Sequence, residues 1–100
     1  MALMFEPDRA VYDRQEGLLR LFATDGVVLV RCAVSKAALA ELEDDALAGP
    51  EAMISTYGRN REHIQAIAER KYRSRRFEPG GSVVVRLEDV AAQRVATSVA

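Results

Sequence analysis

Residues 17–34 read GLLRLFATDGVVLVRCAV, two apolar runs of high β-propensity separated by Thr24-Asp25-Gly26. An Asp-Gly pair between such runs is typical of a β-hairpin, since both central positions of a type I′ turn need positive φ. With Asp25 and Gly26 as the two-residue loop, Thr24 pairs with Val27. This pairing predicts one wholly apolar face, made of Leu19, Leu21, Ala23, Val28, Val30 and Cys32.

The opposite face of this hairpin mixes arginines with apolar side chains. The same register sets Arg20 directly opposite Arg31, and like charges in opposed positions destabilise a sheet. Either a carboxylate or another anion lies between the two guanidinium groups, or the loop is longer and the register differs. Because an apolar patch rimmed by arginines is typical of an interface, this face is a candidate contact surface. It consists of Leu18, Arg20, Phe22, Leu29, Arg31 and Arg86, with Val84 in the same patch.

The segments on either side of the hairpin predict one strand each. Residues 3–9 have a short apolar start and then Pro7, which predicts an edge strand followed by a turn because proline cannot donate to a strand ladder. Residues 82–87 alternate apolar side chains between two faces, which predicts a closing strand. The tail from Glu88 has no clear caps, so a frayed short helix and disorder both stay open. We expect one domain of residues 1–90 and an extension of residues 91–100.

Between the hairpin and the closing strand, the apolar spacing predicts two helices. Ser35 is a good N-cap for a helix over residues 36–47, which Gly49 and Pro50 end. A longer amphipathic helix follows over residues 51–72. The expected class is therefore α+β, with a small, mainly antiparallel sheet and both helices packed on the apolar face of the hairpin.

Half of the basic residues gather in one segment. Of the chain's 14 lysines and arginines, seven lie in residues 59–76 against two acids, although the whole chain carries a net charge of −1. Such a segment binds an anionic partner such as a nucleic acid, forms a protein or self-association surface, pairs with the acidic run of residues 41–45, or is an ordinary solvated face, and these alternatives stay open. The candidate contact residues on this segment are Arg59, His63, Arg70, Arg73, Arg75 and Arg76.

No side chain belongs to a catalytic or metal-binding pattern. His63 has no second histidine or cysteine at ligand spacing, so we interpret it as an ordinary surface or rim histidine. Cys32 is the single cysteine and projects into the apolar face, where a thiol behaves as a small hydrophobe. We expect no catalytic residue, metal or cofactor. The lack of a signal-sequence pattern or a membrane-spanning run predicts a cytoplasmic location.

Asn60 and Arg61 form a polar pair on the second predicted helix. Asn60 lies within the apolar stripe of that helix, and Arg61 lies at the edge of the stripe. Polar groups in such places need hydrogen-bond partners. The structural interpretation gives Asn60 a neighbouring backbone group, and gives Arg61 an acid of the hairpin or of the N-terminal segment. The functional interpretation makes the pair a small recognition site.

Several short motifs occur in a familiar order: Phe5-x-Pro7, Tyr12-Asp13, Asp25-Gly26, Ala38-Leu39, Asn60-Arg61-x-x-Ile64, Ala68, Tyr72 and Asp89. Together they resemble the bacterial family known as domain of unknown function 1488, over roughly residues 4–90. The resemblance implies a small α+β domain, and it implies no activity, catalytic residue or cofactor.

The sequence thus favours a non-enzymatic protein-interaction or self-association module, with the arginine-rimmed sheet face as its contact surface. The alternative hypothesis is nucleic-acid or anion binding through residues 59–76. No membrane association and no small-molecule substrate are expected.

Overall fold

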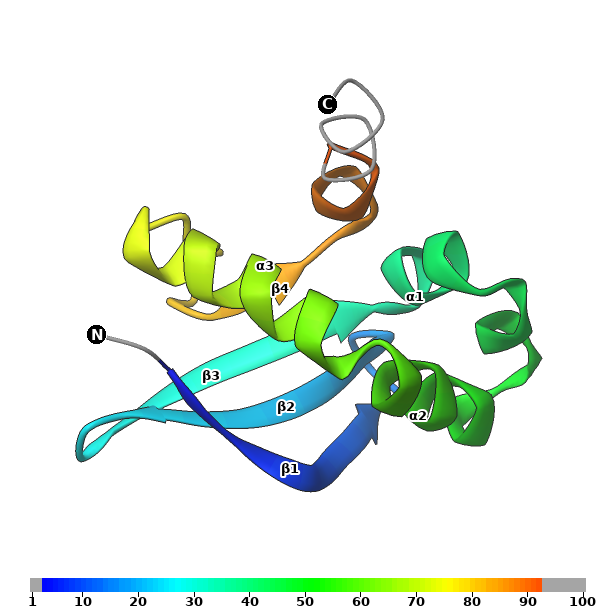
Figure 1. The fold of residues 1–100 in the computed structure, drawn as a ribbon, viewed down its shortest axis with the longest axis horizontal. Helices are drawn as coiled ribbons and strands as arrows, with labels where there is room; N and C mark the ends of the chain where they lie inside the picture. The colour runs from blue at the N-terminus through cyan, green and yellow to red at the C-terminus, as the bar shows by residue number, and fades with distance from the viewer. Residues whose placement is uncertain (1–2, 93–100) are drawn as a thin grey trace.

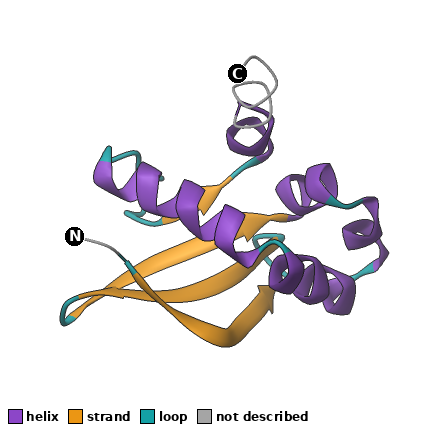
Figure 2. Cartoon of the chain, viewed as in Figure 1, coloured by secondary structure: helices purple, strands orange, loops and turns teal. Residues whose placement is uncertain are grey.

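A four-stranded sheet carries the helices on one of its sides in this computed structural model, which describes residues 3–92 (Figures 1 and 2). The strands β1 (Met4–Asp13), β2 (Leu18–Asp25), β3 (Val28–Ser35) and β4 (Val83–Val85) lie side by side in that order. The first three are antiparallel and β4 is parallel to β3. The prediction of an α+β class with a mainly antiparallel sheet is confirmed.

The hairpin forms where the sequence predicts it, but with a different register. Asp25 pairs with Val28, so Gly26 and Val27 are the loop residues and the predicted Thr24–Val27 pair is wrong. Gly26 has φ +65° and Val27 has negative φ, which is the pattern of a type II′ turn, with glycine at the first central position. Arg20 therefore lies opposite Ala33, and Arg31 lies opposite Phe22. The direct opposition of the two arginines does not occur: the register differs, as one alternative predicted, but the loop still has two residues and the longer loop of that alternative is wrong.

The first predicted helix is shorter than expected. Ser35 accepts a hydrogen bond from the Ala38 amide at 3.1 Å, as an N-cap does, and α1 (Lys36–Leu42) ends before Glu43, whose backbone is extended. A 3₁₀ helix, η1 (Asp44–Ala48), follows in place of the last helical turns.

The second predicted helix is in fact two helices. α2 (Pro50–Arg59) and α3 (Arg61–Arg73) are separated by Asn60, whose φ of −116° and ψ of 20° are not helical. The Asn60 amide N–H donates to the carbonyls of Thr56 and Tyr57, which closes α2. A single helix over residues 51–72 is therefore wrong. Figure 1 shows α3 lying across the sheet and α2 at one end of it.

Both flanking strands also differ from expectation. β1 continues past the predicted turn after residue 7, with a register shift between Phe5 and Ala10, and it forms one edge of the sheet. β4 covers only residues 83–85 of the predicted 82–87. It does not alternate between buried and exposed residues, because both faces of the sheet are covered there.

Residues 87–92 are helical, which favours the helix alternative for that part of the tail. The rest of the predicted extension, residues 93–100, lies outside the described residues.

The core fills the space between the sheet and the helices. Leu19, Leu21, Ala23, Val30 and Cys32 face it from the hairpin, as predicted, but Val28 is exposed near the hairpin tip. The helices contribute buried side chains from each of their predicted stripes. These are Ala38, Leu39, Met53, Tyr57, Ile64, Ile67 and Ala68.

Candidate functional site

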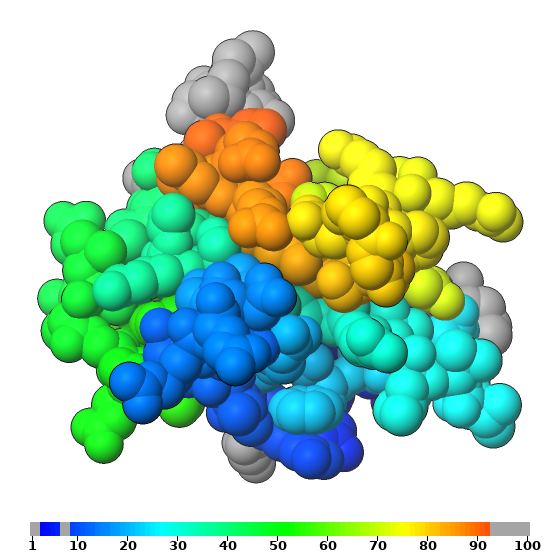
Figure 3. Space-filling view, turned by 180° about the vertical axis from the view of Figure 1, so that it is seen from behind, coloured from blue at the N-terminus to red at the C-terminus, as the bar shows by residue number. Residues whose placement is uncertain are grey.

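The side of the sheet that faces away from the helices is largely uncovered over β1, β2 and β3. Figure 3 shows this side, with the blue and cyan strands open to view beside the orange and yellow segments. We call it the bare face and define it by the side chains that the strand register brings to one side. They are Met4, Val11, Arg20, Phe22, Leu29 and Arg31.

Apolar side chains on the bare face are unusually open to solvent. Leu29 is 79% exposed, Met4 69% and Val11 50%. Phe22 is half-buried because the guanidinium carbon of Arg9 lies 4.0 Å from its ring centroid, a cation–π contact. A hollow of about 320 Å³ lies against Phe22, Leu29, Arg20 and Arg31. The face thus offers an apolar strip with cations along it.

Two of the predicted arginines have carboxylate partners within the chain. Arg20 lies 2.8 Å from Asp13 at the end of β1, the strand on the other side of β2 from Arg31, so this carboxylate is not the one between the two arginines that the predicted register required. Backbone N–H donation from Glu16 and the guanidinium of Arg20 together lower the pKa of Asp13. Arg86 lies 2.9 Å from Glu78, and this contact lowers the pKa of the Glu78 carboxyl.

Two residues of the predicted sheet-face patch are not on the surface. Leu18 and Val84 are buried with Ala33 in a small second cluster, beneath the rim of a hollow of about 300 Å³. Arg31, Arg86 and the segment from Glu78 to Ser82 border the same hollow. The structure therefore brings Arg20, Phe22, Leu29, Arg31 and Arg86 together at the surface, with Leu18 as their support.

The basic segment is divided and partly neutralised. Its first residue, Arg59, lies 2.7 Å from Glu43 of the acidic run, and Arg73 lies 3.8 Å from Glu69. Because α2 and α3 are separate helices, the cations do not form one continuous row. Arg70 is exposed on α3, and Arg75 and Arg76 are exposed in the turn that follows it. Arg75 has a φ of 58°, and it borders a hollow of about 320 Å³ beside Tyr72 and Phe77.

Asn60 joins three segments at the junction of α2 and α3. Its Nδ2 donates to Glu43 Oε2 at 2.7 Å and to the Thr56 carbonyl at 2.8 Å. Donation from Arg59, and then from Asn60, lowers the pKa of Glu43. Arg61 and the half-buried His63 line a hollow of about 410 Å³ at this junction. Within residues 3–92, no cluster of histidine, cysteine and acidic side chains has the geometry of a metal site.

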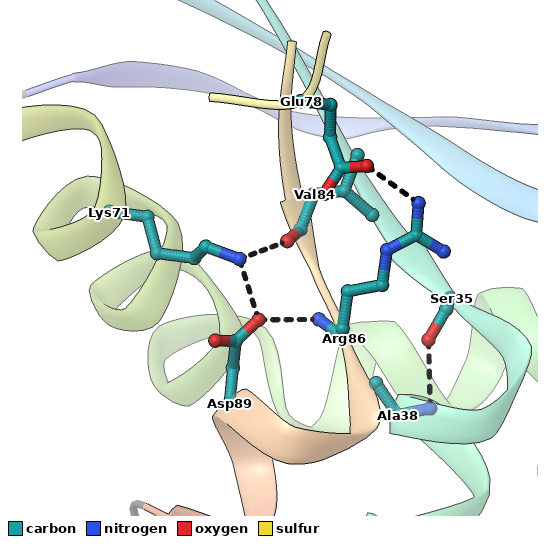
Figure 4. Close-up of polar contacts among 7 residues, drawn as sticks. All are labelled: Ser35, Ala38, Lys71, Glu78, Val84, Arg86 and Asp89. Carbon is teal, nitrogen blue, oxygen red and sulfur yellow. Dashed lines mark hydrogen bonds and ion pairs between the residues drawn. The ribbon is translucent and has the colours of Figure 1, made fainter. Parts of the chain in front are cut away.

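A polar network holds the outer edge of β4. Lys71 Nζ donates to the Val84 carbonyl and to Asp89 Oδ2, both at 2.8 Å, and the Arg86 amide donates to the same carboxylate at 2.8 Å (Figure 4). The last contact is half of a capping box, with Arg86 at the N-cap of the helix over residues 87–92. The Val84 carbonyl is therefore already engaged by the chain's own lysine at this edge.

Cys32 lies deep in the core, 1% exposed. Burial raises the pKa of its thiol to about 11, because a thiolate loses its hydration there. The thiol remains protonated at neutral pH.

Sequence reasoning missed Met4 and Val11 as members of the bare face. The signal was present: Ala10-Val11-Tyr12 is a β-rich run between Pro7 and Gly17, and it predicts a longer first strand. Pairing of that strand with β2 then sets Val11 beside Arg20 and Met4 beside Thr24.

The comparisons with known proteins agree on one family. The family model DUF1488, described as a protein of unknown function, matches residues 3–85. A crystal structure of a DUF1488-family protein of unknown function from Shewanella loihica PV-4 is similar, with a TM-score of 0.77 over 84% of this chain and 91% of that chain. At 19% identity the likeness concerns the fold alone. No curated protein matches the chain. Among the described residues, none of the helices has the length and apolar character that a membrane span requires.

Proposed function

This chain belongs to the DUF1488 family of proteins of unknown function, and we propose that it is a non-enzymatic module that associates with a second copy of itself through the bare face. The observation that carries the proposal is the exposure of Leu29, Met4 and Val11 on one side of the sheet. Scattered exposed apolar residues are normal, but a grouped set rimmed by arginines is typical of an interface.

The charge pattern of the bare face favours a copy of the chain over a strongly charged partner. Arg20 is paired with Asp13, Arg86 with Glu78, and Arg9 with Glu6. Because these pairs cancel, the face has little net charge to repel an identical face. These arginines already form ion pairs with acids of the same chain, so they are less available to a highly anionic partner such as a nucleic acid.

The absence of an enzymatic role is part of the proposal. For the single cysteine, burial raises the pKa of the Cys32 thiol, which disfavours the thiolate that a cysteine nucleophile or redox centre needs. The cytoplasmic location expected from the sequence stays a prediction.

Sedimentation equilibrium of the full chain, up to millimolar concentration, tests the proposal. We expect a reversible dimer that Leu29→Ser weakens at least about tenfold, because a buried leucine side chain contributes roughly 1.5–3 kcal/mol. The matched control is Ile54→Ser, since Ile54 is an exposed apolar residue on α2. A chain that stays monomeric throughout this range, or a dimer that responds equally to both variants, contradicts the proposal.

One observation favours the alternative of nucleic-acid binding. Arg75 and Arg73 border the same hollow as Tyr72 and Phe77, whose rings lie 6.0 Å apart, and cations beside aromatic rings are typical of single-strand binding surfaces. A titration of a single-stranded oligonucleotide at increasing salt tests this alternative. Affinity that falls steeply with salt and is lost in Phe77→Ala supports it, and no binding at low salt dismisses it.

A further inference from the structure

Most charged side chains around the hollow of about 300 Å³ beside the bare face are satisfied within the chain. Arg20 is held by Asp13, through contacts of 2.9 Å from Nε and 2.8 Å from the terminal nitrogen. Arg86 is held by Glu78 at 2.9 Å. Arg20 and Arg86 thus each have a carboxylate partner within the chain, so neither guanidinium group needs an acid from a binding partner.

One acid and one base of the same hollow are left over. Glu16, in the turn between β1 and β2, and Arg31, on β3, both line it and both are exposed. Within the described part of the chain, neither side chain makes an ion pair or a side-chain hydrogen bond. Arg31 also lines the hollow against Phe22 and Leu29, so it links the charged region to the apolar strip.

An unpaired acid and an unpaired base that line one hollow can each meet the opposite charge of a second copy of the chain. In a two-fold dimer the interface is isologous: if residue i meets residue j of the other copy, then j meets i. A face that carries one charge of each sign is thus complementary to itself. Burying either charge alone is unfavourable, because it loses its hydration without gaining a partner, whereas the reciprocal arrangement gives each charge a partner.

We propose that the bare face pairs with a second copy across a two-fold axis, in which Glu16 of each copy forms an ion pair with Arg31 of the other. This inference rests on the proposed self-association and adds its orientation. The axis passes close to the hollow, so that the two ion pairs flank it. The apolar strips around Phe22 and Leu29 then close against the opposite copy.

Charge reversal with rescue tests the arrangement in the full chain, by sedimentation equilibrium. Arg31→Glu sets two carboxylates against each other, and Glu16→Arg sets two guanidinium groups against each other. Each should weaken the dimer at least about tenfold, because opposed like charges at an interface are costly. The double variant exchanges the signs and should return the dissociation constant to within about threefold of the original. The control is Glu62→Arg, an exposed reversal on α3, on the helix side of the sheet.

The outcomes separate the two proposals. A dimer that Leu29→Ser weakens but that both single reversals leave unchanged overturns the Glu16–Arg31 pairing and leaves the proposed function intact. A double variant that is as weak as the singles also overturns the pairing. A wild-type chain that remains monomeric overturns both. Thermal unfolding followed by circular dichroism checks that each variant retains the fold.

Discussion

Asn60 Nδ2 lies 2.7 Å from Glu43 Oε2, although 17 residues separate the two along the chain. The other oxygen of the same carboxylate accepts from Arg59 at 2.7 Å. Glu43 stands where α1 has just ended, and Asn60 stands where α2 ends and α3 begins. One carboxylate therefore joins the ends of two helices at the point where the chain turns back over the sheet.

Replacing Asn60 by alanine should loosen this junction. Asn60→Ala removes both side-chain hydrogen bonds, to Glu43 and to the Thr56 carbonyl, and we expect a loss of about 1 kcal/mol in the free energy of unfolding. Urea denaturation measures it. Ser55→Ala is the control, since Ser55 is exposed on α2, which Asn60 ends. Equal effects of the two substitutions would show that the Asn60 amide contributes nothing specific.

The break at Asn60 shows what a helical pattern cannot predict. The apolar stripe before and after Asn60 keeps the same spacing, so the periodicity alone gives no sign that two helices replace one. The interaction that ends α2 comes partly from Glu43, outside the segment in which the period is read. The spacing of apolar residues within one helix does not predict a contact with a residue 17 positions away. The acidic run of residues 41–45 did suggest an intramolecular partner for the basic segment, and Glu43 with Arg59 is that contact.

The hairpin shows the opposite case, in which an error of register left the interpretation of the faces intact. The loop lies one residue later than the Asp-Gly signal indicates, so each partner moves by two positions. Because side chains alternate with a period of two, a shift of two returns every residue to its predicted face. The core residues of the hairpin and its part of the bare face could therefore be predicted from residues 17–34, whereas Met4 and Val11 of β1 lie outside that stretch and were missed. The parallel pairing of β4 could not, since three valines fit either direction.

Two glycine substitutions should change stability in opposite directions. Gly26→Ala places a side chain at φ +65°, a region that costs an alanine about 1 kcal/mol, and it should destabilise the chain by about that amount. Gly58 lies within α2, and no atom lies within 4 Å of the position that its Cβ would take. Gly58→Ala should therefore stabilise the chain by about 0.5–1 kcal/mol. Thermal unfolding measures both: stabilisation by Gly26→Ala would contradict the turn geometry, and destabilisation by Gly58→Ala would contradict an open helical site at residue 58.

The Lys71–Asp89 pair should show strong coupling because little solvent screens it. The two side chains are 12% and 13% exposed, and they lie 2.8 Å apart. Lys71→Met leaves the carboxylate without its cation, and we expect a loss of about 2 kcal/mol. A double-mutant cycle with Asp89→Asn should give a coupling energy of about 1–2 kcal/mol. The exposed Arg73–Glu69 pair is the control, expected below about 0.5 kcal/mol, and a comparable coupling there would refute the special role of the Lys71 pair.

The buried thiol of Cys32 should make stability fall at alkaline pH. Burial raises its pKa to about 11 from the usual 9.0, so the folded chain keeps a proton that the unfolded chain releases. This contribution to stability is complete below pH 9 and is lost as the pH rises toward about 11, by roughly 1 kcal/mol per pH unit.

Tyr57 and Tyr72, whose pKa values are also raised, make stability fall over the same alkaline range. The comparison must therefore be with Cys32→Ala, which keeps both tyrosines. Although this variant is less stable overall because of the cavity, its free energy of unfolding should decline less steeply over that range than that of the wild type. Parallel curves for the two proteins, or rapid labelling of the native thiol at neutral pH, would show that Cys32 is not held in the protonated form.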